Sequence, residues 1–177
     1  MKLRLLLFLL AGLVAIPGAQ AQTQTETEDR LAKEIPNYVR PPDGKVAYAG
    51  QPSEDGFQAV KDAGFKTVIN LRPADEMSFD EKKVVEGLGM AYVNIPITTF
   101  SITEEKVGQL ADLLGDPDAA PVLFHCGSSN RVGGMWYIYR VLFEEASEEE
   151  AMEEAVEYGL RNATLTTVVK EYVSERK

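Results

Sequence analysis

The feature that most constrains this chain is the ten-residue segment His125–Gly134, which lies between an apolar run and a helix-like stretch. The apolar residues Pro121–Phe124 precede it, and the only tryptophan of the chain follows it closely. This order predicts a buried strand, a tight loop and a helix. Such a loop directs its backbone N–H groups and the N-terminus of the helix at one point, which is how proteins hold an oxyanion such as phosphate or sulfate.

The loop opens with Cys126, the only cysteine of the chain, and closes with Arg131. A single cysteine excludes an intramolecular disulfide. A thiol beside a helix N-terminus and an arginine is biased toward the thiolate, which is the nucleophilic form. A buried structural cysteine is the alternative, but the adjacency of His125 and Arg131 favours a reactive one. The pattern predicts covalent transfer of a group from an anionic substrate.

The N-terminus has the layout of a secretory signal peptide. Lys2 and Arg4 precede the apolar stretch Leu5–Ile16, and the small-residue pattern Ala19-Gln20-Ala21 follows it. A membrane span is the alternative, for which the apolar run is short. We expect residues 1–21 to be removed and the protein to be secreted or periplasmic.

The remainder predicts one domain, because a chain of 177 residues that is 45% hydrophobic can bury a substantial core. Residues 22–35 are mostly polar and acidic and are expected to form a flexible leader, with the domain over residues 36–177. The net charge of −10 becomes −12 when the two basic residues of the signal peptide are removed. This acidic balance argues against nucleic acid as a partner, and against a membrane once the signal peptide is cleaved. The oligomeric state stays open.

Buried-type strands alternate with helices along this domain, which predicts an α/β fold with a mainly parallel central sheet flanked by helices. The expected strands are Val46–Gly50, Thr67–Leu71, Ala91–Ile97 and Val122–His125. The expected helices are about Ser53–Ala63, Ser78–Leu88, Val132–Glu145, Glu148–Tyr158 and Leu165–Val173.

Local signals add detail to this outline. Ser78 with Glu81, Ser101 with Glu104 and Ser147 with Glu150 have the spacing of a capping box, which marks three helix starts. An antiparallel edge pairing is expected between Tyr38–Arg40 and Val46–Gly50. Ligands of such sheets lie at the carboxyl ends of the strands, where Arg72, Thr98 and Cys126 fall.

The cysteine loop resembles the signature of the cysteine-based protein tyrosine and dual-specificity phosphatase superfamily. The bacterial branch known as the beta-lactamase-hydrolase-like phosphatase domain is more similar still. Its likeness extends over about residues 38–159 and rests on three segments, namely Ala49-Gly50-Gln51-Pro52, Val68-Ile69-Asn70-Leu71-Arg72-Pro73, and Asn130-Arg131-Val132-Gly133 with Trp136.

The resemblance implies a tyrosine-phosphatase-like fold of dual-specificity size and a cysteine-dependent phosphatase. Cys126 would be the nucleophile, and a phosphocysteine intermediate would be released by water, with no metal or cofactor. His125 would orient the loop. Phosphate would be bound by Arg131 and the loop residues Gly127, Ser128, Ser129 and Asn130. The implied substrates are phosphate monoesters, either a phosphorylated protein or a small phosphoester, with phosphotyrosine or an aryl phosphate favoured.

The chain departs from the main phosphatase signature within the loop. Four residues separate cysteine from arginine where the signature has five, and Val132 replaces a hydroxyl residue after the arginine. Ser129 stands where the bacterial branch often has glycine, and a non-glycine there costs about 1 kcal/mol if the position requires a positive φ. Gly127 is expected to supply some of that freedom.

The general acid is not evident from the sequence. The related phosphatases carry an aspartate in the loop that here reads Ile97–Ser101, which contains no acid. A carboxylic acid that protonates the leaving oxygen typically contributes about 10²–10⁴-fold. Asp75 and Glu76 are the nearest substitutes, and Arg72 is expected to be a second anion contact.

Two alternatives remain open at this stage. A rhodanese-like sulfurtransferase would form a persulfide on Cys126, and its six-residue loop has the length of the segment from Cys126 to Arg131. A non-catalytic phosphate-binding module would keep the loop without turnover, as the missing aspartate suggests.

Overall fold

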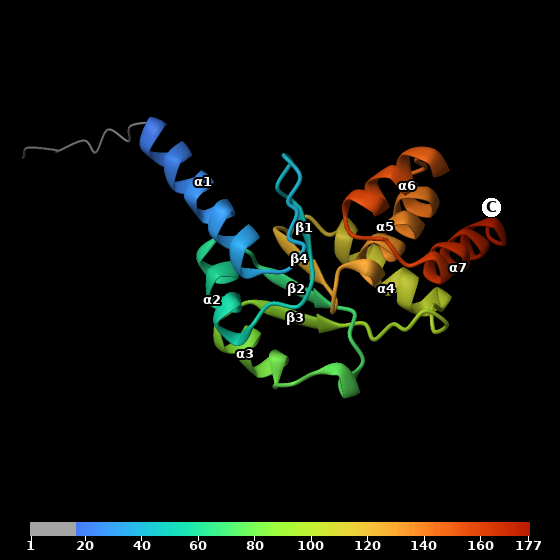
Figure 1. Ribbon diagram of the computed structural model, residues 1–177, viewed down its shortest axis with the longest axis horizontal. Coiled ribbons are helices and arrows are strands. Elements are labelled where there is room, and N and C mark those ends of the chain that lie inside the picture. Colours follow the sequence, from blue (N-terminus) through green and yellow to red (C-terminus); the bar gives the residue numbers. More distant parts are fainter. Residues whose placement is uncertain (1–16) are drawn as a thin grey trace, which may run out of the picture.

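The computed structural model describes residues 17–177, with side chains from Thr25 onward (Figure 1). Most of the predicted signal peptide therefore lies outside the described residues. Within residues 17–177, no helix is long and apolar enough to cross a membrane. The elements in chain order are α1 Pro17–Glu34, β1 Val46–Ala49, α2 Glu54–Asp62, β2 Thr67–Asn70, the 3₁₀ turn η1 Ala74–Glu76, α3 Glu81–Gly87, β3 Ala91–Asn94, α4 Glu104–Gly115, β4 Val122–His125, α5 Asn130–Phe143, α6 Glu148–Glu157 and α7 Ala163–Ser174.

Four parallel strands form the sheet in the order β1-β4-β2-β3, which confirms the predicted α/β class. His125 pairs with Ala49 on one side and with Asn70 on the other, and Asn70 pairs with Asn94. The carboxyl ends of all four strands therefore meet at one edge. The expected antiparallel pairing beside β1 is reduced to one bridge between Val39 and Tyr48.

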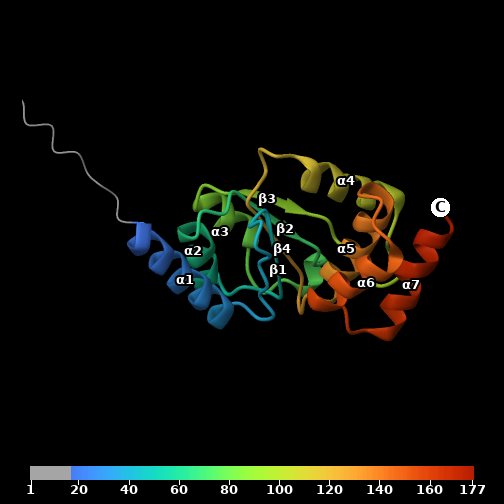
Figure 2. The same ribbon diagram turned by 90° about the horizontal axis from the view of Figure 1, so that it is seen from above.

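Helices cover both faces of the sheet, with α1, α2 and α3 on one face and α4 to α7 on the other (Figures 1 and 2). Each face has its own hydrophobic core. Alternate residues of β4 enter different cores, Leu123 toward α2 and Phe124 toward α5, because successive strand side chains point to opposite faces. Cys126 belongs to the core of the α5 face.

The segment expected to be a flexible leader, residues 22–35, is instead helical up to Glu34, and the backbone N–H of Ile35 continues the pattern by donating to the Leu31 carbonyl at 2.9 Å. Leu31 and Ile35 are buried in the core shared with α2. They are four residues apart and lie on one helical face, so two apolar side chains anchor an otherwise polar helix. The folded unit therefore begins before residue 36.

Two of the three predicted capping boxes are wrong. Asp80 and Thr103 are the N-caps of α3 and α4, each accepting from the backbone N–H three residues later. Only Ser147 caps its helix as predicted, accepting from the backbone N–H of Glu150 at 3.2 Å. Glu81 is therefore the first residue of α3 rather than part of a capping box, and it is 1% exposed.

Candidate active site

The cysteine loop lies at the carboxyl edge of the sheet, between the end of β4 and the start of α5. Its outer side is held by the Gln51 backbone N–H, which donates to the Gly127 carbonyl at 3.2 Å, and by Asn37 Nδ2, which donates to the Ser128 carbonyl at 3.3 Å. Among the described residues, the backbone N–H groups of Gly127 and Ser128, together with those of residues 130 and 131, donate to no protein atom. These amides are free to bind an anion.

Cys126 is completely buried at the base of this loop. The His125 side chain is oriented toward the opposite core, where its ring lies 6.0 Å from the ring of Phe57. This is the alternation expected for consecutive residues at a strand end.

Ser129 adopts the left-handed conformation, with φ at 65°. The strain expected for a non-glycine residue is therefore present at this position, and Gly127 does not relieve it, since its φ is not positive. The Ser129 hydroxyl donates to the Tyr158 carbonyl at 2.7 Å. Gly159 packs against it so closely that an added β-carbon would lie 2.6 Å from the Ser129 β-carbon.

The Asn130 side chain faces away from the anion position. Its Oδ1 accepts the backbone N–H groups of Arg161 at 2.7 Å and Asn162 at 2.8 Å, which attaches the start of α5 to the start of α7. Asn130 can therefore contact a phosphate through its backbone N–H but not through its side-chain oxygen.

Arg131 is held by two partners on one side of its guanidinium. Nη1 donates to Glu76 Oε1 and to the Ile97 carbonyl, both at 2.9 Å, and Nη2 donates to Glu76 Oε2 at 2.6 Å. A guanidinium has five N–H donors, so Nε–H and the second Nη2–H are not used by Glu76 or Ile97, and the Cys126 side chain interacts with this guanidinium. Nη2 lies 3.5 Å from the point that a β-carbon at Gly127 would occupy, which places this pair beside the loop.

Arg131 and Glu76 each favour the charged form of the other. Burial lowers the pKa of Arg131, but the hydrogen bonds to Glu76 and the charge of Cys126 outweigh it, so the pKa of Arg131 is raised. The hydrogen bonds from Arg131 hold the pKa of Glu76 below its usual value, against partial burial. Glu76 is therefore a carboxylate here and has no proton to donate. Asp75, its neighbour, makes no hydrogen bond or ion pair within residues 25–177.

Arg72 does not converge on the loop. Its Nη1 donates to Gln51 Oε1 and its Nη2 to the Glu76 carbonyl. Its Nε is buried, and lies 3.6 Å from Glu76 Oε2. Both terminal nitrogens of Arg72 thus hold protein oxygens, so this side chain is fixed by Gln51 and the Glu76 backbone, and direct phosphate binding by Arg72 stays a prediction.

A residue that the sequence reasoning missed lies behind the loop. Glu81 Oε1 is 2.9 Å from His125 Nε2, and both side chains are buried. Burial raises the pKa of Glu81, but the hydrogen bonds from His125 and Gln51 outweigh it, so the pKa is lowered overall. The spacing of Glu81 from Ser78 matches a capping box, so the sequence predicted that Glu81 lies exposed at the start of a helix.

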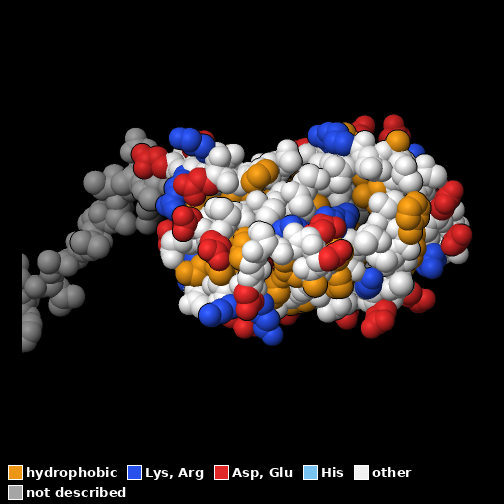
Figure 3. Space-filling view, turned by 60° about the horizontal axis from the view of Figure 1, so that its bottom comes forward, with side chains coloured by type: hydrophobic (Ala, Val, Ile, Leu, Met, Phe, Trp, Pro, Cys, Tyr) orange, Lys and Arg blue, Asp and Glu red, His pale blue; other side chains and the backbone are white. Residues whose placement is uncertain are grey.

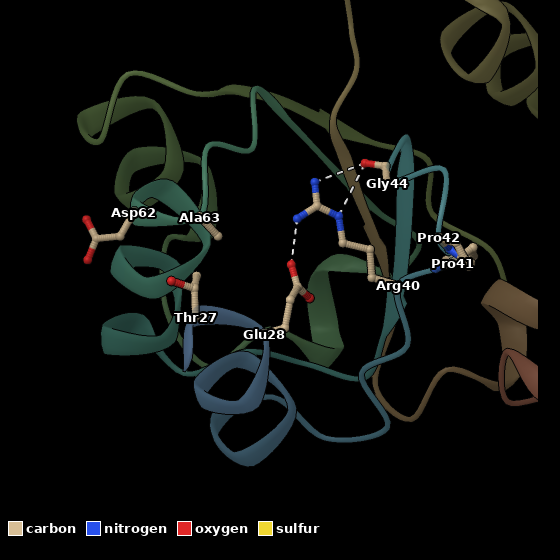
Figure 4. Close-up of a pocket in the computed structure, with 8 residues that line it drawn as sticks. All are labelled: Thr27, Glu28, Arg40, Pro41, Pro42, Gly44, Asp62 and Ala63. Atoms are coloured by element: carbon tan, nitrogen blue, oxygen red, sulfur yellow. Dashed lines mark hydrogen bonds and ion pairs between the residues drawn. The ribbon is translucent and has the colours of Figure 1, made fainter. Parts of the chain in front are cut away.

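Ser128 and Asn130 of the cysteine loop line a small groove on the outer side of the loop. A larger groove lies between α1, α2 and the chain around Arg40, which donates to Glu28 and to the Gly44 carbonyl (Figure 4). No residue of the cysteine loop lines it. The space-filling view shows basic and acidic side chains interspersed over the visible face rather than a continuous basic area (Figure 3).

Residues 23–171 match the family described as DSP-PTPase phosphatase fused to NAD+ kinase. The chain is 27% identical over 111 residues to a beta-lactamase hydrolase-like protein of Xylella fastidiosa, covering 60% of this chain and 26% of that protein. The chain thus spans about a quarter of the length of that relative.

Solved structures share the fold. A putative phosphatase (DUF442) from Shewanella putrefaciens CN-32 aligns with a TM-score of 0.64 and 22% identity, covering 82% of this chain and 97% of the other. Tk-PTP in its active form aligns with a TM-score of 0.67 and 23% identity, covering 80% and 99%. With the family match extending over most of its length, the chain belongs to the family of DSP-PTPase phosphatases.

Proposed function

We propose that this phosphatase hydrolyses phosphate monoesters through a phosphocysteine on Cys126. The thiolate attacks phosphorus, the S–P bond forms and the ester P–O bond breaks, so the leaving group departs with the bonding electron pair. Water then attacks the phosphocysteine, which releases inorganic phosphate and restores the thiol. The free loop amides and the remaining N–H pair of Arg131 stabilise the oxygens of the transferring group.

One observation carries this proposal. Glu76 and the Ile97 carbonyl occupy both Nη1–H groups and one Nη2–H group of Arg131, and the Nε–H and second Nη2–H groups lie beside the cysteine loop. A planar pair of N–H groups matches two oxygens of a phosphoryl group. The pair is held in place before any ligand enters. Such preorganisation is the usual source of electrostatic stabilisation in an enzyme.

The proposed substrates are phosphotyrosine or aryl phosphates, in a protein or a small molecule. Two similar structures contain related ligands. TpbA of P. aeruginosa, with a TM-score of 0.53 and 16% identity, is in complex with pTyr, and PTPMT1, with a TM-score of 0.62 and 19% identity, is in complex with PI(5)P. Aryl esters are favoured here because the loop Ile97–Ser101 lacks an acid and a phenolate leaves without a proton more easily than an alkoxide does.

Glu76 is assigned the role of orienting Arg131. Its two oxygens occupy the outer donors, so the guanidinium cannot rotate without breaking two charge-assisted hydrogen bonds. Proton donation by Asp75 or Glu76 stays a prediction, which for Glu76 requires release from Arg131 during the reaction.

A turnover panel tests the proposed function. An aryl phosphate, phosphotyrosine and phosphoserine peptides, and thiosulfate are offered to the protein beginning at Gln22, with Cys126→Ser as the control. Mass spectrometry of acid-quenched protein then identifies the adduct on Cys126. A phosphocysteine supports the proposal, a persulfide supports the sulfurtransferase, and neither supports the binding module.

We also propose that the protein is exported, with no nucleic-acid or membrane partner after cleavage. The basic start and the apolar Leu5–Ile16 support this proposal. Fractionation of the producing cell, with the N-terminal mass of the purified protein, tests it. A protein that retains Met1 and sediments with membranes would contradict the proposal.

A further inference from the structure

Glu81 is the start of a chain of polar contacts that runs behind the cysteine loop. Its Oε1 accepts from His125 Nε2 and from Asn70 Nδ2, each at 2.9 Å. Its Oε2 accepts from Gln51 Nε2 at 2.7 Å. As a carboxylate, Glu81 can only accept, so each of these partners must present an N–H.

In the remaining contacts, the donor and the acceptor can be assigned in only one way. Because Gln51 turns its NH₂ to Glu81, its Oε1 faces Arg72, whose Nη1 donates to it. Arg72 can only donate, so both ends of the chain fix the orientation of the Gln51 amide. The other terminal nitrogen of Arg72 donates to the Glu76 carbonyl, and the Glu76 carboxylate holds Arg131.

We infer that Glu81 is a positioning residue of this phosphatase, which holds the proton of His125 on Nε2 and, through Gln51, Arg72 and Glu76, places Arg131 for the substrate phosphate. The inference rests on the proposed function only in that Arg131 is the group that binds phosphate. Glu81 itself touches neither the substrate nor the reacting sulfur.

Because donor and acceptor are fixed at each of these contacts, exchanging the side chains of positions 51 and 81 is a specific test. In Glu81→Gln, an amide NH₂ faces the NH₂ of Gln51. If Gln51 turns over to relieve this conflict, its NH₂ faces Arg72, so one repulsion replaces another. In Gln51→Glu, two carboxylates face each other at a separation of 2.7 Å in the present geometry.

The double variant Gln51→Glu with Glu81→Gln restores complementary partners at every contact of the chain except one. Glutamine at position 81 still accepts from His125 and donates to the new glutamate, which accepts from Arg72. The exception is the Pro52 carbonyl, which accepts from Gln51 Nε2 at 3.0 Å and would lose its donor. Rescue is therefore expected to be partial.

The test measures the affinity for inorganic phosphate as the rise of Tm with phosphate concentration, which reports folding and binding in one titration. The matched control is Glu86→Gln, the same chemical change on α3 at a side chain that is 50% exposed and paired with Lys82. We expect Glu81→Gln and Gln51→Glu each to weaken phosphate binding by about tenfold or more, the scale of a misplaced active-site group. The control should stay within about twofold, and the double variant should bind more tightly than either single variant.

Equal affinities in Glu81→Gln and Glu86→Gln would overturn the inference, and so would a double variant whose losses simply add. If the single variants do not fold, the double variant alone decides. A phosphate affinity of the double variant more than about tenfold below that of wild type would then refute the inference. Because phosphate binding needs no turnover, failure of the inference is distinguishable from failure of the proposed reaction, which only the turnover panel reports.

Discussion

Replacing Glu76 by glutamine removes the group that orients Arg131 while keeping its shape. One carboxylate oxygen becomes an NH₂ group that faces an Arg131 nitrogen at 2.6 Å or 2.9 Å, depending on the amide orientation. A hydrogen bond to a charged group contributes about 1.5–3 kcal/mol when protected from water. The Glu76 side chain is 38% exposed, so solvent screening reduces this to about 1–2 kcal/mol. At about 1.4 kcal/mol per factor of ten, kcat/KM should fall by about 5- to 30-fold.

The assay compares Glu76→Gln with Asp75→Asn, the same chemical change at the neighbouring residue that does not contact Arg131. Steady-state hydrolysis of an aryl phosphate gives kcat/KM, and Tm against phosphate gives affinity. An orienting role lowers both quantities for Glu76→Gln and leaves the phosphate affinity of Asp75→Asn unchanged. Tighter phosphate binding by Glu76→Gln would refute this reasoning, because it would mean that Glu76 competes with the substrate for Arg131. A fall in kcat of about 10²–10⁴-fold with unchanged phosphate affinity would identify Glu76 as the general acid instead.

Four further predictions concern the loop and its pH dependence. Cys126→Ser should abolish turnover with Tm within a few degrees of wild type, measured by hydrolysis and thermal unfolding, since the hydroxyl is a far weaker nucleophile at the same position; residual wild-type activity would remove the mechanism. Arg131→Lys should lose at least about tenfold in kcat/KM, because an ammonium has three N–H donors and cannot replace the three bonds to Glu76 and Ile97 together with two bonds to phosphoryl oxygens. A variant within about twofold of wild type would contradict the assigned role. Ser129→Ala and Ser129→Gly both lose the bond to Tyr158, but glycine relieves the positive φ, so denaturant unfolding should find the glycine variant about 1 kcal/mol more stable than the alanine variant. The pKa of Glu76 is lowered in the folded protein, so its effect on Arg131 is complete above the ordinary value of about 4.3 and is lost only as the pH falls through the lowered value; a pH–affinity profile for phosphate with a Glu76-dependent step above pH 5 would be inconsistent with this.

The sequence by itself determined the fold class and the chemical centre of the site. Alternation of buried strands with helices was sufficient for a parallel sheet, because only short-range periodicity and crossover geometry are involved. Strand β4 was predicted at its observed bounds, and the position of Cys126 after it followed from the strand-to-loop transition. The positive φ of Ser129 was raised as a condition only by the resemblance, because the bacterial branch often has glycine at this position.

Only the tertiary structure decided which charged side chains serve the loop. Arg131 and Glu76 are 55 residues apart, and His125 and Glu81 are 44 apart, so no local pattern couples them. The helix α1 was missed for a related reason: its stability comes from Leu31 and Ile35 packing on α2, and packing rather than propensity stabilises a polar helix. A helix cap and a buried carboxylate look alike in sequence, because Glu81 three residues after a serine satisfies the local pattern whichever way its side chain turns. The parallel sheet turns it inward by bringing His125, Asn70 and Gln51 to one edge, where an acceptor shared by three donors is worth more than a cap exposed to water.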